Sequence, residues 1–153
     1  MKTKGKLIRE QLETTLQRFQ PLKAAPIPVK GWVRAIRDAL GMSGRQMAGR
    51  AGVSKQRASF IEKQELDGSA TLKTMRKAAE ALDCVFVYGF VPRTSLEETV
   101  RRQAALVASK RLALASHTMS LEDQALRVRE NQEILRGMIQ ELAETTPKNL
   151  WDA

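Results

Sequence analysis

Apolar residues recur at helical spacing through most of the chain, interrupted by short polar and glycine-containing breaks. Residues 3–19 place Ile8, Leu12, Leu16 and Phe19 three or four positions apart, which predicts an amphipathic helix. The same periodicity predicts further helices at residues 32–40, 71–82, 95–116 and 120–143, and two short ones within residues 43–63. Residues 21–31 hold three prolines and are predicted to form an extended linker.

The stretch at residues 43–63 predicts two helices joined by a tight turn. Ser43 and Ser54 suit N-cap positions, because a serine hydroxyl accepts a backbone N–H of the first turn. Gly52 suits the break between them, since glycine adopts a positive φ without steric cost. Ala58 and Ile61, three apart, predict the buried face of the second helix. Such a pair is typical of a helix-turn-helix, whose second helix enters the major groove of DNA. The alternative is an ordinary helical hairpin with a solvated polar face.

These helices and their neighbours are predicted to enclose one core. Its members are the apolar positions that share an inward face: Val33, Ile36, Leu40, Met47, Val53, Ile61, Leu72, Met75 and Leu82.

Residues 84–91 differ from the rest, because β-branched and aromatic residues dominate them, and they predict one short β-strand. A lone strand leaves its backbone groups unpaired, so it needs a partner. That partner is either a second copy of the strand across a homodimer axis, with Val85, Val87 and Phe90 as the dimerisation residues, or a segment of another protein. The alternative is that residues 84–91 are an apolar segment that packs on the core without backbone hydrogen bonds to another strand.

The last predicted helix carries Leu121, Val128, Leu135 and Leu142 at intervals of seven, a narrow stripe that suits a coiled coil. We expect this helix instead to pack against residues 95–116 of the same chain, because polar residues interrupt the second row of apolar positions that a coiled coil needs. Trp151 suggests either a docking anchor or an exposed tail residue.

The predicted domains are 1–30 (helix and linker), 31–83 (helix-turn-helix), 84–92 (strand) and 93–153 (helical extension). The predicted fold is therefore mainly α, a helix-turn-helix bundle with one short strand and additional N- and C-terminal helices.

The net charge of +9 is unevenly placed. Residues 1–30 hold seven Lys and Arg against two Glu, residues 31–92 hold ten cations against six acids, and residues 93–153 hold nine of each. All the excess positive charge thus lies in residues 1–92, the part of the chain that includes the helix-turn-helix, which indicates a polyanion partner, namely double-stranded DNA. Membrane binding by the basic helix at residues 3–19 is the less favoured alternative.

Catalytic and metal-binding patterns are missing from the sequence. One histidine, His117, and one distant cysteine, Cys84, cannot build a zinc site, and no glycine-rich phosphate loop is present. We therefore expect no metal, no cofactor and no enzymatic activity. The N-terminal residues lack the apolar core of a signal peptide, and a single cysteine fits a reducing compartment, so a cytoplasmic location is expected.

The exposed side of the second helix supplies the candidate site. Lys55, Gln56 and Arg57 occupy its first exposed turn and are the predicted base-contacting residues, with Ser59 one turn further on. Lys and Arg pair with guanine acceptors, whereas Gln pairs with adenine. The predicted phosphate contacts are Ser43, Arg45, Gln46, Arg50 and Ser54.

The stretch from Gly31 to Leu82 resembles the Xre/Cro-type helix-turn-helix family of phage and bacterial repressors. The residues that carry the resemblance are Ser43, Met47-Ala48, Gly52-Val53-Ser54, Ile61-Glu62 and Ala78-Ala79-Glu80-Ala81-Leu82. That family often has a phosphate-gripping Gln just after the first cap. This chain has Gly44 there, which leaves Arg45 and Gln46 as substitutes.

A longer resemblance covers most of the chain. GWVRAIRDALGMS, TLKTMRKAAEALDCVFVYGFVP, SLEETVRRQA and HTMSLEDQ are similar to the family called mobile mystery protein A. Its members are helix-turn-helix proteins typically encoded beside a Fic-domain protein, mobile mystery protein B, on mobile elements. The resemblance implies a regulator, with an antitoxin-like protein that restrains a Fic-domain partner as the alternative.

Overall fold

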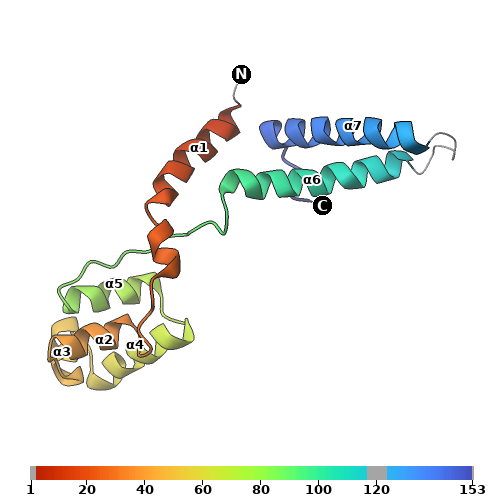
Figure 1. The fold of residues 1–153 in the computed structure, drawn as a ribbon. Coiled ribbons are helices and arrows are strands. Elements are labelled where there is room, and N and C mark those ends of the chain that lie inside the picture. Colours follow the sequence, from red (N-terminus) through yellow and green to blue (C-terminus); the bar gives the residue numbers. More distant parts are fainter. Residues whose placement is uncertain (1–2, 117–123, 153) are drawn as a thin grey trace. The chain divides into compact units, whose positions relative to one another are not determined.

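The computed structural model describes residues 3–116 and 124–152 and shows a mainly helical protein (Figure 1). The predictions that involve His117 and Leu121, and the start of the last helix at residue 120, lie outside the described residues. The elements in order are α1 (Lys4–Gln17), η1 (Gln20–Ala24), α2 (Trp32–Ala39), α3 (Gly44–Ala51), α4 (Lys55–Asp67), α5 (Leu72–Ala81), α6 (Leu96–Ser116) and α7 (Gln124–Thr145). They form two compact units, residues 24–89 and residues 1–23 with 90–153.

The unit at residues 24–89 is a bundle of α2 to α5 around a small apolar core. The buried members are Val33, Met47, Ile61, Ala78, Ala81 and Leu82, with Ile36 and Met75 packed against them. The predicted core is confirmed at Val33, Ile36, Met47, Ile61, Met75 and Leu82, whereas Ala78 and Ala81 were not predicted. The prediction is wrong at Leu40 and Leu72, which are 56% and 44% exposed, and Val53 is half-buried outside this cluster. Leu40 is the C-cap residue of α2 and Leu72 is the first residue of α5, so both sit at helix ends beyond the packed faces.

Two carboxylates of α4 hold α2 at both of its ends. Glu62 accepts a hydrogen bond from Nε of Arg37 at 2.7 Å, in an ion pair whose side chains are largely buried. Glu65 accepts from the backbone N–H groups of Trp32 (2.6 Å) and Val33 (3.0 Å), and so caps the N-terminus of α2. Gly31, with a φ of 81°, makes no side-chain cap itself, and a Cβ there would lie 2.9 Å from the Glu65 carboxylate. The end of α4 is therefore fixed against the start of α2.

Residues 84–91 contain no β-strand, which corrects the sequence prediction. The segment follows a left-handed Asp83 (φ 56°) that ends α5. A two-residue alternation is present over residues 84–87, where Cys84 and Phe86 are half-buried while Val85 and Val87 are exposed, and it ends at the exposed Tyr88. No backbone hydrogen bond joins residues 85–91 to the rest of the described chain. The start of the segment has the side-chain pattern of a strand, but the described residues offer it no neighbouring strand.

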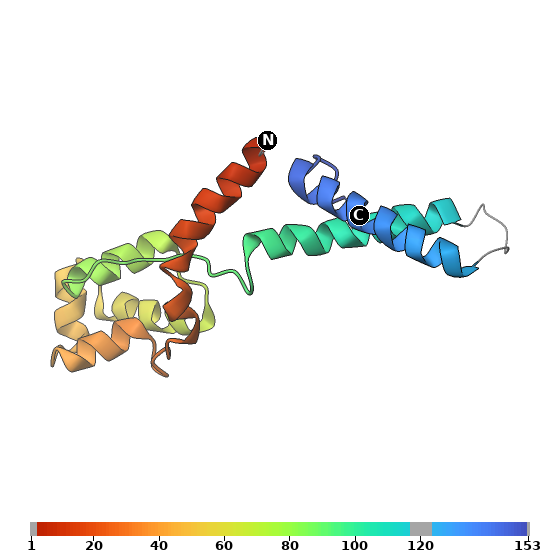
Figure 2. The ribbon, with the colours of Figure 1, turned by 45° about the horizontal axis from the view of Figure 1, so that its top comes forward.

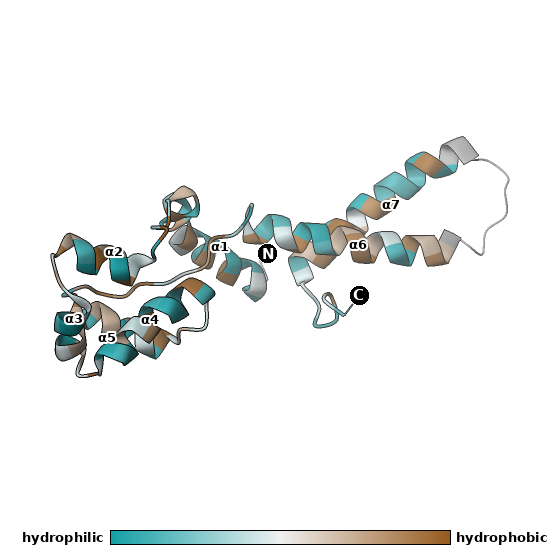
Figure 3. Cartoon of the chain, turned by 90° about the horizontal axis from the view of Figure 1, so that it is seen from below, coloured by the Kyte–Doolittle hydropathy of each residue, from teal (hydrophilic) through white to brown (hydrophobic). Residues whose placement is uncertain are grey.

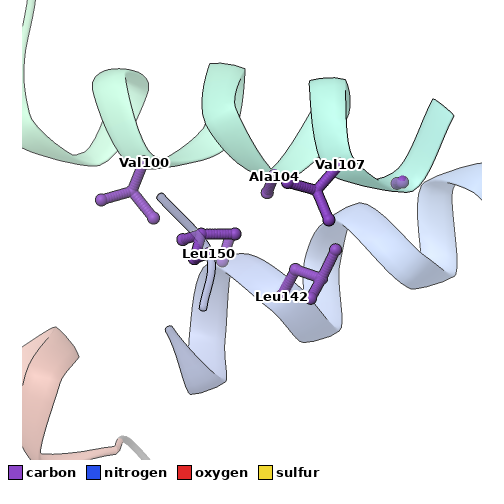
Figure 4. Close-up of a cluster of buried hydrophobic side chains, with 7 residues drawn as sticks. Val100, Ala104, Val107, Leu142 and Leu150 are labelled. Carbon is purple, nitrogen blue, oxygen red and sulfur yellow. The ribbon is translucent and has the colours of Figure 1, made fainter. Parts of the chain in front are cut away.

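In the unit at residues 1–23 and 90–153, α6 and α7 lie side by side as a helical hairpin (Figures 1 and 2). Their side chains point toward one another in a core of Val100, Ala104, Val107, Ala108, Leu142, Ala143 and Leu150 (Figure 4). This confirms the preference for packing within the chain over a coiled coil. Leu150, fully buried, is the anchor of the C-terminal segment, whereas Trp151 is 56% exposed. Leu114 and Val128, at the far end of the hairpin, are exposed.

Polar contacts join α1 to this hairpin. Arg9 forms an ion pair with Glu97 at 3.2 Å and donates to the carbonyl of Ala143 at 2.8 Å, and Glu13 accepts from the N–H of Leu96 at 2.8 Å. The predicted helix at residues 3–19 is confirmed, but its apolar face at Leu7, Ile8 and Leu12 stays about half exposed. The predicted extended linker is wrong at its start, where residues 20–24 form a 3₁₀-helix. None of the described helices has the length and apolarity needed to cross a membrane.

Candidate nucleic-acid interface

The geometry of α3, the turn and α4 follows from three local features. Ser43 and Gln46 form a capping box: the N–H of Gln46 donates to Ser43 Oγ at 3.2 Å, and the N–H of Ser43 donates to Gln46 Oε1 at 2.8 Å. Gly52 ends α3 in the left-handed region with a φ of 67°. The N–H of Val53 then reaches back to the carbonyl of Ala48 at 3.0 Å, which closes the turn.

Ser54 begins α4 by accepting a hydrogen bond from the N–H of Arg57 at 3.1 Å. The rotation of α4 about its axis is set by Ala58 and Ile61, which are 0% and 4% exposed. With those two inward, Lys55, Gln56, Arg57 and Ser59 are all exposed. The structure thus brings the four predicted base-contacting residues together on one exposed end of a capped helix.

The five predicted phosphate-contacting residues are exposed as well, but several have structural partners. Ser43 and Gln46 use Ser43 Oγ and Gln46 Oε1 as acceptors in the capping box, which leaves the Ser43 hydroxyl and the Gln46 amide nitrogen to donate. Arg50 donates from Nε to the carbonyl of Ala81 at 2.6 Å, which ties α3 to the end of α5. Among the described residues, the Arg45 side chain makes no hydrogen bond of this kind, so its guanidinium remains available to contact a phosphate.

Sequence reasoning missed a pair of lysines on α5. Lys73 and Lys77 are exposed and line, with Arg57, a cavity of about 170 Å³ between α4 and α5. Their spacing of four residues puts them on one helix face, and that spacing was visible in the sequence. They add positive charge beside the predicted base-contacting turn.

It also missed Phe60. This ring is 49% exposed on α4, and the guanidinium carbon of Arg57 lies 5.5 Å from the ring centroid. Phe60 follows Gln56 by four residues, so a helical projection of the sequence would have placed it on the same outward face.

The acids of α4 near its middle are turned away from this surface. Glu62 and Glu65 are occupied by α2, as described above. The hydrogen bond to Glu62 raises the pKa of the Arg37 guanidinium, against the opposing effect of burial. The outward side of the first two turns of α4 therefore carries Lys55 and Arg57 and no carboxylate (Figure 3 shows hydrophilic positions on α3, α4 and α5). This charge arrangement suits a polyanion.

Comparison with known protein families matches residues 33–86 to the helix-turn-helix family. This part of the chain is an Xre-type helix-turn-helix domain, a class that binds DNA. No curated protein and no solved structure matches the chain. Within the described ranges, no three His, Cys, Asp or Glu residues gather in a way that would hold a metal ion.

Proposed function

We propose that this protein is a sequence-specific DNA-binding transcriptional regulator that acts in the cytoplasm as a homodimer. The observation that carries the proposal is the capped start of α4, where Lys55, Gln56, Arg57 and Ser59 are exposed opposite the buried Ala58 and Ile61. This arrangement stands within a helix-turn-helix domain. The N-terminal end of such a helix enters the major groove.

Each group of side chains has a separate task in this proposal. Lys55 and Arg57 donate to guanine acceptors, Gln56 pairs with adenine, and Ser59 adds a weaker contact. Ser43, Arg45, Gln46, Arg50 and Ser54 contact phosphates, and Lys73 and Lys77 join them. Phosphate contacts give affinity without sequence preference and make binding sensitive to salt.

Dimerisation is proposed because one small domain makes too few contacts for tight specific binding. The seam is the segment at residues 84–92, where Val85, Val87 and Phe90 are 87%, 72% and 82% exposed, and where residues 85–91 make no backbone–backbone hydrogen bond within the described chain. Two such segments, related by a two-fold axis, would form an antiparallel ladder and bury these side chains. A dimer bound over its own promoter would exclude polymerase, which makes the protein an autorepressor, in keeping with the mobile-element family that the sequence resembles.

A second candidate function is that of an antitoxin-like protein that restrains a Fic-domain partner. The favouring observation is that the hairpin of α6 and α7 leaves Leu106, Val128 and Ile134 more than half exposed, in a region with no excess positive charge. Co-expression with the Fic-domain protein encoded beside it, compared with binding to its upstream DNA, separates the two functions. Capture of that protein without any sequence preference on DNA would favour the antitoxin.

Substitution of Gln56 tests the proposed function. Gln56→Ala removes one bidentate contact to adenine, so discrimination at one base pair should fall by about 1–3 kcal/mol. The measurement is competition between upstream DNA and random duplex, read by fluorescence anisotropy. Gln132→Ala, an exposed glutamine on α7, is the matched control and should change nothing. If the Gln56 variant competes as the wild type does, α4 does not read bases.

A further inference from the structure

Phe60 is an apolar side chain on the otherwise polar outward face of α4. It is 49% exposed, it follows Gln56 by one helical turn, and it lies away from the buried Ala58 and Ile61. Its ring is therefore presented beside a predicted base-contacting residue and does not complete the core of the domain.

The Arg57 guanidinium lies over this ring. Its central carbon lies 5.5 Å from the Phe60 centroid, within the range of a cation–π contact. The N–H groups of a guanidinium form a planar fork that matches two adjacent acceptors. Phe60 and Arg57 thus lie within cation–π distance of one another on the exposed side of α4 before any ligand binds.

The chemistry of the major groove fits this pair. Guanine presents O6 and N7 to an arginine fork, and thymine presents a C5 methyl group that phenylalanine contacts. Successive bases along one strand are about 3.4 Å apart, so a ring and the guanidinium over it can reach neighbouring base pairs. A simple surface lysine or arginine would offer the charge without the apolar contact.

We propose that Phe60 and Arg57 form one reading unit for a thymine beside a guanine: Phe60 contacts the thymine methyl, and Arg57 pairs with the guanine. The inference rests on the proposed DNA binding and deepens it. It makes Phe60 a specificity-determining residue and gives its contact with Arg57 a function in recognition.

Deoxyuridine tests the unit, because it differs from thymidine only by the missing methyl group. A duplex selected by the full-length protein from a random library is resynthesised with each thymine replaced in turn. One replacement in each half-site should weaken wild-type binding about fourfold, the effect expected for one buried methyl group. Phe60→Ala should bind both duplexes equally, whereas Phe60→Leu should keep part of the difference.

Controls separate this inference from the proposed function. Leu66→Ala removes another exposed apolar side chain from the last turn of α4 and should leave the deoxyuridine effect intact. Arg57→Lys, which keeps the charge but not the planar fork, should lose about tenfold of the preference for the neighbouring guanine. The inference is overturned if no replacement affects the wild type, or if Phe60→Ala stays equally sensitive, although DNA binding would still stand. A library in which no sequence is enriched would overturn both.

Discussion

Glycine at position 52 matters for its backbone conformation and not for the space around it. Its φ of 67° places it in the left-handed region, and no atom lies within 4 Å of an added Cβ. Gly52→Ala should therefore destabilise the domain by about 1–2 kcal/mol, the cost of the left-handed conformation for an L-residue. Gly49→Ala is the matched control within α3, where the space around a Cβ is also open and φ is helical. That change should stabilise the domain by about 0.5–1 kcal/mol. Urea denaturation followed by circular dichroism measures both, and shifts of the same sign would contradict this assignment.

At the scale of elements, the orientation of α4 depends on its attachment to α2. Glu65 accepts from two backbone N–H groups at the start of α2, so Glu65→Ala should cost about 1–2 kcal/mol, as for the loss of an N-cap. Glu65→Gln keeps one acceptor oxygen and should cost less. Glu80→Ala, an exposed glutamate on α5, is the control for loss of a carboxylate. If Glu65→Ala unfolds at the same urea concentration as Glu80→Ala, the cap contributes nothing to stability.

The elements also show what sequence could and could not predict. Ser43, Ser54 and Thr71 were predicted as helix starts because a cap depends on hydrogen bonds within three residues. The Glu65 cap joins residues 32 positions apart, and no local pattern encodes it. Residues 84–91 carry the composition of a strand, but a ladder also depends on a neighbouring strand, and the described residues of one chain provide none. The four-residue spacing from Gln56 places Phe60 on the outward face, but its contact with the Arg57 side chain depends on side-chain conformations that the spacing does not give.

At the scale of the whole molecule, the proposed dimer depends on the backbone of residues 84–92. Val87→Pro removes a donor from the proposed ladder without disturbing a helix, so the dimer should dissociate and DNA affinity should fall. Val87→Ala keeps the backbone N–H and is the control for loss of the side chain alone. Sedimentation velocity reads both variants. A Val87→Pro protein that remains dimeric would move the interface elsewhere, to the exposed apolar positions of α6 and α7.

We propose above that the exposed end of α4 reads DNA sequence within a symmetric dimer. The most direct measurement is selection of binding sites from a random duplex library by the full-length protein, followed by sequencing of the bound pool. The account predicts two short inverted half-sites whose centres lie about 10 base pairs apart, or a multiple of that spacing. It also predicts that Gln56→Ala loses the preference at one position of each half-site. A bound pool with no enriched sequence, or an enriched sequence unchanged by Gln56→Ala, would contradict it.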